Sequence, residues 1–402
     1  MALDMTSFSA ALKQLYPVSK IENLVYRDHP LFALLPKMRN FDGETAKIAL
    51  QYGNSQGRSA IFSTAQANKT NILLKAFILE RTKDYSLASI DNETIQASKN
   101  NTGAIVAAAQ RAIDGAFDSL TRSLATSLFG TGSGSLGQVA ADADGTSFEL
   151  KNINDVVKFE VGMQVVFSAT DGGGAVKSGS VAVTSVNRDN GVIGVEVLTG
   201  IAGGAGVLEN DFVFVQGDYD RKIKGLRAWL PDVAPSAGDM FFGVDRSIDP
   251  TRLAGVRYDG SAESIEEALI GAASRLAREG GRPDTCIMDY SKFANLEKAL
   301  GSKVQYVDLK ATADIGFRGM QVHGPKGTIK IIADQDCPSD RAFLLQVDTW
   351  SLMSLGNCPQ LLNSDGNNML RDSNSDSVEI RTGYYANLAC TAPGYNCNIK
   401  LD

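Results

Sequence analysis

The longest uninterrupted helical pattern in the sequence lies between Asn101 and Gly130. Its apolar residues recur at spacings of three and four and so form one stripe along a helix: Ile105, Ala109, Ile113, Phe117, Leu120, Leu124 and Leu128. At about 1.5 Å per residue this helix is roughly 40 Å long, which exceeds the radius of an ordinary domain. The sequence therefore predicts a helix that spans an extended part of the molecule or, alternatively, a long core helix of a globular protein.

Composition indicates a folded protein with little imidazole chemistry. The chain of 402 residues is long enough for two or three domains, and its 44% hydrophobic and 21% charged residues are ordinary for globular proteins. With only two histidines, a histidine-based metal site is not expected. The formal net charge of -7 argues against extensive binding to nucleic acid, because neutralising phosphates requires clustered lysine and arginine.

Targeting signals and disulfide patterns are absent from the sequence. The sequence contains no run of about eighteen apolar residues, so no membrane-spanning helix is predicted. The first residues include Asp4 and lack a basic segment followed by an apolar block, so no signal peptide is predicted. The five cysteines are odd in number and form no C-x-x-C pair, which favours reduced thiols in a chain that folds in the cytoplasm.

Two segments that precede the long helix cannot bury themselves alone. Residues 1–44 carry short apolar bursts broken by prolines, which predict an extended arm with one short helix at 8–15. Residues 45–52 and 71–84 have strand-like patterns, and Gly57 and Arg58 lie near the first bend between them. Because a lone two-stranded hairpin is marginal in water, we expect it to lean on another element or subunit.

The long helix is followed by the glycine-rich stretch GTGSGSLG. Its Gly132, Gly134 and Gly137 match the spacing G-x-G-x-x-G, but a dinucleotide site needs a strand before that motif and a helix after it. Here a helix precedes the motif and none follows, so we interpret the stretch as a flexible linker.

Residues 146–217 have a β-rich texture that differs from both flanks. Five short strand-like runs are separated by turn clusters: 148–150, 163–168, 180–186, 192–198 and 212–215. Asn190-Gly191 is typical of a tight hairpin. The pattern predicts a small β-barrel or sandwich inserted as its own unit, which either displays a binding surface or only stabilises the host fold.

The remainder of the chain predicts mixed α and β structure. A helix at 263–279 has candidate caps in Ser261 and Ser264 and ends at Gly280. A second helix is predicted at 291–300, and strands are predicted at 285–288, 329–333, 342–347, 350–355 and 378–389.

The sequence contains no pattern for catalytic, cofactor-binding or metal-binding residues. His29 and His323 stand beside proline or glycine, where imidazole commonly bonds to a turn. Asp334 and Asp336 lack the further spaced carboxylates of a calcium loop and are predicted to turn a loop. These observations predict a protein that is not an enzyme and needs no cofactor. The alternative is an enzyme or binding module whose site has an unfamiliar pattern.

The order of these parts resembles the major capsid proteins of tailed bacteriophages, which share the Hong Kong ninety-seven phage-type shell fold. In that family an arm, an extended hairpin loop and a long spine helix precede an α+β axial domain and a return to the peripheral domain. Three runs are similar to capsid sequences of this group: FFGVDRSIDPTRLAG, IEEALIGAASRLAREGGRPDTCIMDYSKFANLEKAL and DCPSDRAFLLQVDTWSL. Some members carry a β-rich insertion, which residues 135–217 match in kind.

The resemblance implies an α+β phage-type capsid shell fold with a small all-β, barrel-like insertion. It divides the chain into an N-terminal arm (1–44), an extended loop (45–100), the spine helix of the peripheral domain (101–134), an inserted β domain (135–217), a return to the peripheral domain (218–254), an axial domain (255–355) and C-terminal peripheral-domain strands (356–402).

The implied function is that of a major capsid protein, which self-assembles through hexameric and pentameric capsomers into an icosahedral head shell around the double-stranded DNA genome of a tailed phage. Neighbouring subunits would then cover the arm and the hairpin. Gly57 and Arg58 at the loop bend are the expected inter-subunit contact, although Arg58 is equally well interpreted as a solvated tip residue. An encapsulin-like shell around cargo enzymes is the alternative with the same fold.

The resemblance also implies partners. In some relatives a loop lysine is linked covalently to a neighbour's asparagine, but Lys47, Lys69 and Lys75 have no evident partner, so no cross-link is predicted. Built-in scaffolding segments are long N-terminal helical extensions, and only 44 residues precede the loop, so we expect a separate scaffolding protein, with portal and decoration proteins. The shell is expected to hold DNA without sequence-specific binding, to involve no membrane, and to assemble in the host cytoplasm before it becomes part of the virion.

Overall fold

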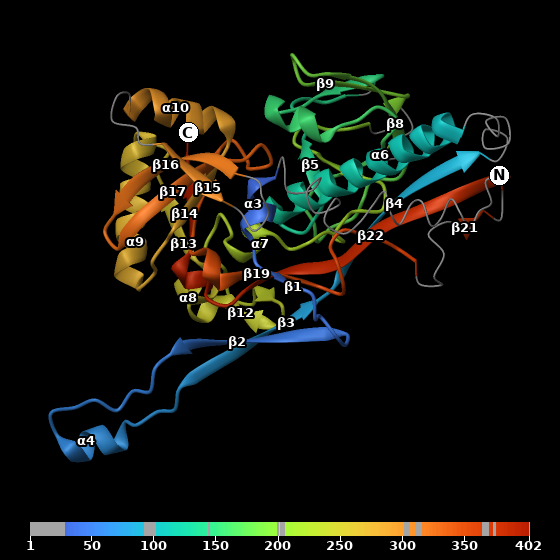
Figure 1. Cartoon of the computed structure of the whole chain (residues 1–402). Coiled ribbons are helices and arrows are strands. Elements are labelled where there is room, and N and C mark those ends of the chain that lie inside the picture. Colours follow the sequence, from blue (N-terminus) through green and yellow to red (C-terminus); the bar gives the residue numbers. More distant parts are fainter. Residues whose placement is uncertain are drawn as a thin grey trace. The chain divides into compact units, whose positions relative to one another are not determined.

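The computed structural model describes residues 29–91, 102–143, 145–198, 201, 206–300, 306–310, 316–363, 370–372 and 375–401. The chain divides into two compact units (Figure 1). The first unit contains Thr82–Ala228 and Leu361–Gly383, and the second contains 29–81, Trp229–Gln360 and 384–401. Both units combine helices with strands, so the fold is α+β as predicted.

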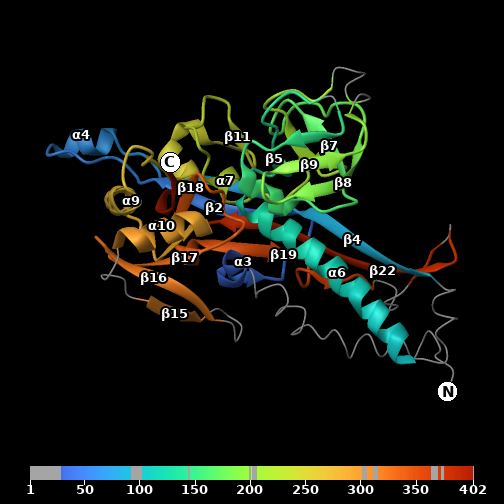
Figure 2. The same ribbon diagram turned by 90° about the horizontal axis from the view of Figure 1, so that it is seen from above.

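The long helix predicted from the sequence is α6 (Thr102–Phe129), which lies along β4 (Thr82–Asp91) in both views (Figures 1 and 2). Five members of the predicted stripe are buried: Ile113, Phe117, Leu120, Leu124 and Leu128. The side chains of Ile105 and Ala109 lie outside the described residues, as do Asn101 and the helix predicted at 8–15. The stripe therefore forms the buried side of the helix over its described part.

The longest strand, β22 (Ser377–Cys390), contributes to both units. In the first unit β4 and β21 (Leu370–Arg371) pair with it, and Thr382 Oγ1 donates a hydrogen bond of 2.7 Å to Ser86 O. In the second unit β19 (Trp350–Ser354) pairs with it in antiparallel fashion, and β1 (Lys37–Met38) pairs with β19 in parallel. The strands predicted at 350–355 and 378–389 are thus confirmed.

The inserted β segment is a six-stranded sheet of order β5-β10-β7-β8-β9-β6 within the first unit. Its strands are β5 (Ser135–Gln138), β6 (Ser147–Glu149), β7 (Gln164–Ser168), β8 (Val181–Asn187), β9 (Val192–Val195) and β10 (Phe212–Val215). A buried core forms inside it, in which Phe148 packs edge-to-face on Phe159 and Phe167. All five predicted strands are present. The tight hairpin predicted at Asn190-Gly191 was wrong: Asn187 pairs with Val192 across a four-residue connection, in which Gly191 but not Asn190 has a positive φ (+72°).

The interpretation of GTGSGSLG as a flexible linker was wrong. Its second half begins β5, which pairs with β10 in antiparallel fashion. Gly134 has φ +84°, and a Cβ at this position would lie 2.8 Å from Asp218 O, so glycine permits a close backbone approach. The strand escaped detection because it is short and its partner lies far along the chain.

The second unit is built on a mixed seven-stranded sheet of order β13-β23-β18-β14-β17-β16-β15. Its strands are β13 (Val256–Asp259), β14 (Thr285–Met288), β15 (Tyr306–Lys310), β16 (Gly316–Gly324), β17 (Gly327–Ala333), β18 (Arg341–Leu345) and β23 (Cys397–Lys400). β23 comes from the segment assigned to the C-terminal peripheral strands. The limits of the named domains stay predictions.

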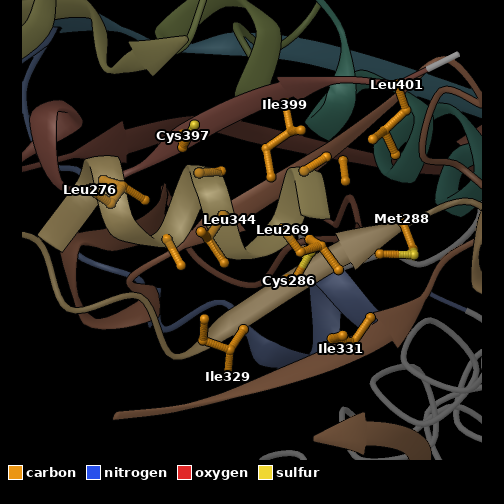
Figure 3. Packing of buried hydrophobic residues seen from close by; sticks show 14 of the residues in the cluster. Leu269, Leu276, Cys286, Met288, Ile329, Ile331, Leu344, Cys397, Ile399 and Leu401 are labelled. Atoms are coloured by element: carbon orange, nitrogen blue, oxygen red, sulfur yellow. The ribbon is translucent and has the colours of Figure 1, made fainter. Parts of the chain in front are cut away.

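Two helices pack on this sheet through one apolar cluster. α9 (Ile265–Glu279) contacts β13 and β23, and α10 (Tyr290–Leu300) contacts α9 and β17. Figure 3 shows Leu269 and Leu276 of α9 among buried side chains of the sheet, which include Leu344 and Ile399. The predicted helix at 291–300 and the predicted strands at 285–288, 329–333 and 342–347 are confirmed.

The start and end of α9 follow the predicted capping chemistry. Ser264 Oγ accepts a hydrogen bond from Glu267 N (3.3 Å), and Glu267 Oε2 accepts one from Ser264 N (3.1 Å), which is a complete capping box. Gly280 ends the helix in the left-handed conformation. Ser261, the other candidate cap, instead bonds to Asp259 in the preceding turn.

Short elements complete the described structure. They are α3 (Pro30–Leu34), α7 (Leu226–Trp229), α8 (Pro250–Ala254), β11 (Met240–Phe241), β12 (Val244–Asp245), β20 (Gln360–Leu361) and the 3₁₀ helices Ile153–Lys158, Arg246–Ile248, Val347–Thr349 and Pro393–Tyr395. Within the described part of the chain, no helix combines the length and hydropathy that a membrane crossing requires.

Candidate functional site

The predicted extended loop is a hairpin of β2 (Thr45–Gly53) and β3 (Leu73–Glu80), which form a two-stranded sheet of their own. Their antiparallel register runs from Thr45 opposite Glu80 to Gly53 opposite Leu73. In both views the hairpin projects away from the sheets of its unit and carries α4 (Phe62–Ala67) at its far end (Figures 1 and 2).

The two faces of the hairpin differ in burial because successive strand residues point to opposite sides. On one face Phe77 and Leu79 are fully buried at the base. On the other face Ile78 is 40% exposed and Leu74 is 62% exposed. Large apolar side chains therefore line a face that the described part of the chain leaves open to solvent, which is a property of interaction surfaces.

An aromatic cluster fixes the base of the hairpin within the second unit. The ring of Phe77 meets that of Trp229 edge-to-face at a centroid distance of 5.0 Å, and Trp229 meets Phe241 in the same way at 5.0 Å. The backbone N–H of Ile78 donates to Phe242 O at 2.9 Å. These contacts fix the base of the hairpin, from which its far end extends.

The far end of the hairpin is closed by its own hydrogen bonds. Thr70 N donates to Gln56 O (2.7 Å), and Gln56 N donates to Thr70 Oγ1 (2.8 Å). Gly57, one of the two predicted contact residues, has φ +150°, and a Cβ there would lie 3.0 Å from Lys69 Cα. Arg58, the other, is exposed in the segment between β2 and α4. Both therefore lie at the tip, and their contact with another subunit stays a prediction.

Sequence reasoning missed α4 and the apolar pair that it displays. Ile61 is 64% exposed and Phe62 is 80% exposed. A six-residue helix is too short to show helical periodicity. The available signal was the adjacent Ile61 and Phe62 inside an otherwise polar stretch.

A buried charge cluster in the first unit connects β4, α6 and the segment after β10. Lys222 Nζ lies 2.6 Å from Asp84 Oδ2 and 2.9 Å from Asp218 Oδ2, and it donates to Ser123 Oγ at 2.9 Å. Burial raises the pKa of Asp218, although the Lys222 charge acts in the opposite direction. The lysine is therefore the cation that compensates two largely buried carboxylates.

Replacing Lys222 by methionine is expected to lower the free energy of unfolding by about 3–5 kcal/mol, because it leaves uncompensated buried carboxylates. Lys158→Met is the matched control, since among the described residues Lys158 has one ion-pair partner, Asp155 at 2.7 Å, and its side chain is 19% exposed, compared with 7% for Lys222. We expect the control to change stability by about 0.5 kcal/mol. Denaturant titration of both variants measures the difference, and equal losses would contradict this assignment.

The histidines and the aspartates flagged in the sequence lie apart from the hairpin tip. His323 Nδ1 lies 3.3 Å from Thr328 Oγ1 across the β16–β17 turn, in line with the prediction. The imidazole of His29 contacts a residue that is distant in sequence, because its Nδ1 lies 2.6 Å from Asp336 Oδ2. Asp334 Oδ1 accepts a hydrogen bond from Asp336 N (3.0 Å), so these residues do turn a loop.

Metal binding and thiol chemistry find no support in the described residues. No group of three or more histidine, cysteine or acidic side chains is placed to hold a metal ion there. All five cysteines are free thiols. Burial raises the pKa values of Cys390 and Cys397 to about 12, which keeps them protonated and unreactive.

Comparison with known proteins places this geometry in context. The family model of the SU10 major capsid protein matches residues 207–367. Among solved structures, the chain is similar to the cyanophage A-1(L) capsid asymmetric unit, with 15% identity, 93% of each chain covered and a TM-score of 0.55. A search of curated proteins found no match.

Two further solved structures resemble the chain more weakly. A chain of Mycobacterium phage Ogopogo shares 9% identity, with 94% of this chain and 93% of that chain covered and a TM-score of 0.43. The holo-SrpI encapsulin complex from Synechococcus elongatus shares 9% identity, with 100% and 96% covered and a TM-score of 0.44. The cyanophage likeness, with its TM-score of 0.55, shows the fold.

Proposed function

We propose, from the premise that this chain is a major capsid protein of a tailed bacteriophage with the Hong Kong ninety-seven type of fold, that its copies close into an icosahedral shell by covering one another's β2–β3 hairpins. The shell would form from hexameric and pentameric capsomers and enclose double-stranded DNA. The family-model match over residues 207–367 also favours this function over that of an encapsulin-like compartment.

The single observation that carries this proposal is the open apolar face of the hairpin. Leu74 and Ile78 are exposed on a two-stranded sheet, and a two-stranded sheet is marginal in water without a covering layer. A second copy of the chain would supply that layer, and repetition of one such contact closes a shell. The proposal therefore gives the exposed face a structural role in assembly.

Sedimentation of the full chain tests this proposal. We expect capsomers or particles, whether the chain is produced alone or with a candidate scaffolding protein. A monomer that persists under both conditions would support an enzyme or binding module instead.

We also infer that the tip residues make a contact with a neighbouring subunit. Arg58 is exposed, and Gly57 gives the tip a backbone conformation that other residues rarely adopt. An exposed ion pair between Arg58 and a neighbour's carboxylate would contribute about 0.2–1 kcal/mol per contact. A shell repeats that contribution at every subunit.

Arg58→Ala is expected to slow particle formation several-fold at low salt and to have less effect at high salt, because salt screens exposed charges. Light scattering at two ionic strengths measures this rate. Arg111→Ala removes another exposed arginine, from α6, and serves as the control. Equal rates for wild type and Arg58→Ala at low salt would leave the tip without an electrostatic role.

Further partners follow from the same function. Exposed apolar faces favour irregular association, and a separate scaffolding protein would limit it. Portal and decoration proteins would complete the head, which we expect to assemble in the host cytoplasm and to persist in the virion. The formal net charge of -7 supports enclosure of DNA without sequence-specific binding. Co-expression with neighbouring structural genes tests each of these partners.

A further inference from the structure

A buried cluster of titratable groups joins α3 to the turn that follows β17 in the second unit. The side chains of His29 and Asp336 are 9% and 6% exposed, and His29 Nδ1 lies 2.6 Å from Asp336 Oδ2. Asp334 is 1% exposed and accepts two backbone hydrogen bonds, from Leu31 N at 3.1 Å and from Asp336 N at 3.0 Å. The root of the predicted arm is therefore bound to this turn by two carboxylates and one imidazole.

Within the described part of the chain, the nearby basic side chains make contacts outside this cluster. Lys37, on the same segment, directs Nζ to Phe32 O at 2.5 Å. Arg341, at the start of β18, forms ion pairs with Asp232 and Asp340. Two further groups of this region, the Cys337 thiol and Asp289 before α10, add no positive charge. The cluster contains two carboxyl groups and at most one imidazolium, so it is free of net negative charge only when at least one carboxyl group carries a proton.

We propose that His29, Asp334 and Asp336 form a pH-controlled latch, which holds residues 29–35 on the second unit most firmly at acidic pH and loosens them progressively as the pH rises to neutral and slightly above. This inference goes beyond shell formation, because it concerns the attachment of the arm within one subunit. The latched segment is otherwise apolar, and Leu31, Phe32, Ala33 and Leu35 are all buried. When the latch opens, the segment that carries these side chains loses the polar contacts that hold the first turn of α3.

The direction of the pH effect follows from the proton that Asp334 holds in the latched form. Burial, and then the charge of Asp336, raise the pKa of Asp334 from its ordinary 3.8 to about 7. In the open form the side chain meets water and regains its ordinary value, so the latched form binds more protons. The stabilisation is therefore complete below pH 3.8 and is lost as the pH rises through about 7.

The same linkage gives the size and shape of the effect. With an Asp334 pKa of about 7 in the latched form and 3.8 in the open form, the ratio of open to latched forms rises about tenfold between pH 6 and pH 8.5. Above that range both forms are ionised and the ratio becomes constant. A rise followed by a plateau distinguishes this latch from general alkaline unfolding, in which the ratio continues to increase.

Hydrogen exchange of the full-length chain, followed by mass spectrometry, tests the latch. The measured quantity is the exchange rate of the peptide that covers residues 30–35, divided by its intrinsic chemical rate at each pH. We expect a tenfold increase between pH 6 and pH 8.5 and then a plateau. The peptide from α9 is the internal control and should show no such increase.

Two variants separate the latch from a merely structural contact. Asp334→Asn keeps the side-chain volume but cannot ionise, so its normalised exchange should be independent of pH. Asp336→Asn retains an acceptor for His29 and removes the second cause of the raised Asp334 pKa, so the rise should end, and the plateau begin, at lower pH. This second variant keeps the proposal testable if Asp334→Asn fails to fold.

A wild-type peptide without the rise, or the same rise in Asp334→Asn, would overturn the proposal. An unmoved midpoint in Asp336→Asn would also overturn it. Because the measurement works on dissociated subunits, a failure of particle formation leaves the result interpretable.

Discussion

The double substitution Leu74→Asp and Ile78→Asp is expected to abolish particle formation while leaving the subunit folded. Both side chains are exposed in the isolated subunit, so each change should cost about 1 kcal/mol of folding stability or less. In an assembled shell both positions would be covered, and burying an unpaired carboxylate costs several kcal/mol. Each subunit would carry this penalty at both substituted positions.

Sedimentation velocity and electron microscopy measure the loss of particles, and thermal unfolding shows that the subunit remains folded. Leu74→Met and Ile78→Val, which keep both positions apolar, form the matched control and should assemble as the wild type does. Normal particles from the doubly acidic variant would show that this face of the hairpin stays outside the interfaces.

Trp229→Ala is expected to lower the free energy of unfolding of the second unit by about 3–5 kcal/mol. The side chain is fully buried and meets the rings of Phe77 and Trp350 at centroid distances of 5.0 Å and 6.3 Å. Its Nε1 also donates to Leu388 O at 3.1 Å, and this buried acceptor would lose its partner. Since Phe77 belongs to β3, the hairpin should lose its fixed base.

Chemical denaturation measures the loss of stability. Trp229→Phe keeps an aromatic ring and removes only the donor and part of the volume, so its loss should be smaller. Val233→Ala, at a position that is 78% exposed, should change stability by about 0.5 kcal/mol or less. A loss of that small size in Trp229→Ala would contradict the central position of the aromatic cluster.

Local patterns in the sequence were sufficient for the elements that carry dense, short-range signals. The stripe from Ile113 to Leu128 predicted the buried side of α6, and one of the two candidate caps, Ser264, begins α9 two residues after the predicted start. The strand-like pattern at 45–52 predicted β2 (Thr45–Gly53). In each case the determining residues lie within or next to one element, so its hydrophobic periodicity and its capping residues can be recognised in the local sequence.

Features formed by distant residues were not predicted. β5 depends on pairing with β10, and β23 lies in the seven-stranded sheet beside β13 and β18, far from both in sequence. The contact between His29 and Asp336 has the same origin. No local period or motif encodes such partners, so they become visible only in the folded chain.

The hairpin itself lies between these two cases. Its strands were predicted and its need for a covering layer followed from its size. Which residues remain open, however, depends on the packing of Phe77 and Leu79 against the unit, which turns Leu74 and Ile78 outward. The two predicted contact residues, Gly57 and Arg58, lie in the segment between β2 and α4, and their role stays a prediction.

The most direct test of shell formation is electron microscopy of particles isolated from phage-producing cells, combined with nuclease protection of their contents. We predict closed icosahedral shells that protect DNA and in which Leu74 and Ile78 of each subunit are covered by a neighbouring subunit. Shells filled with protein would instead indicate an encapsulin-like compartment. Particles in which the hairpin face remains open to solvent, or the absence of this chain from the shell, would contradict the account.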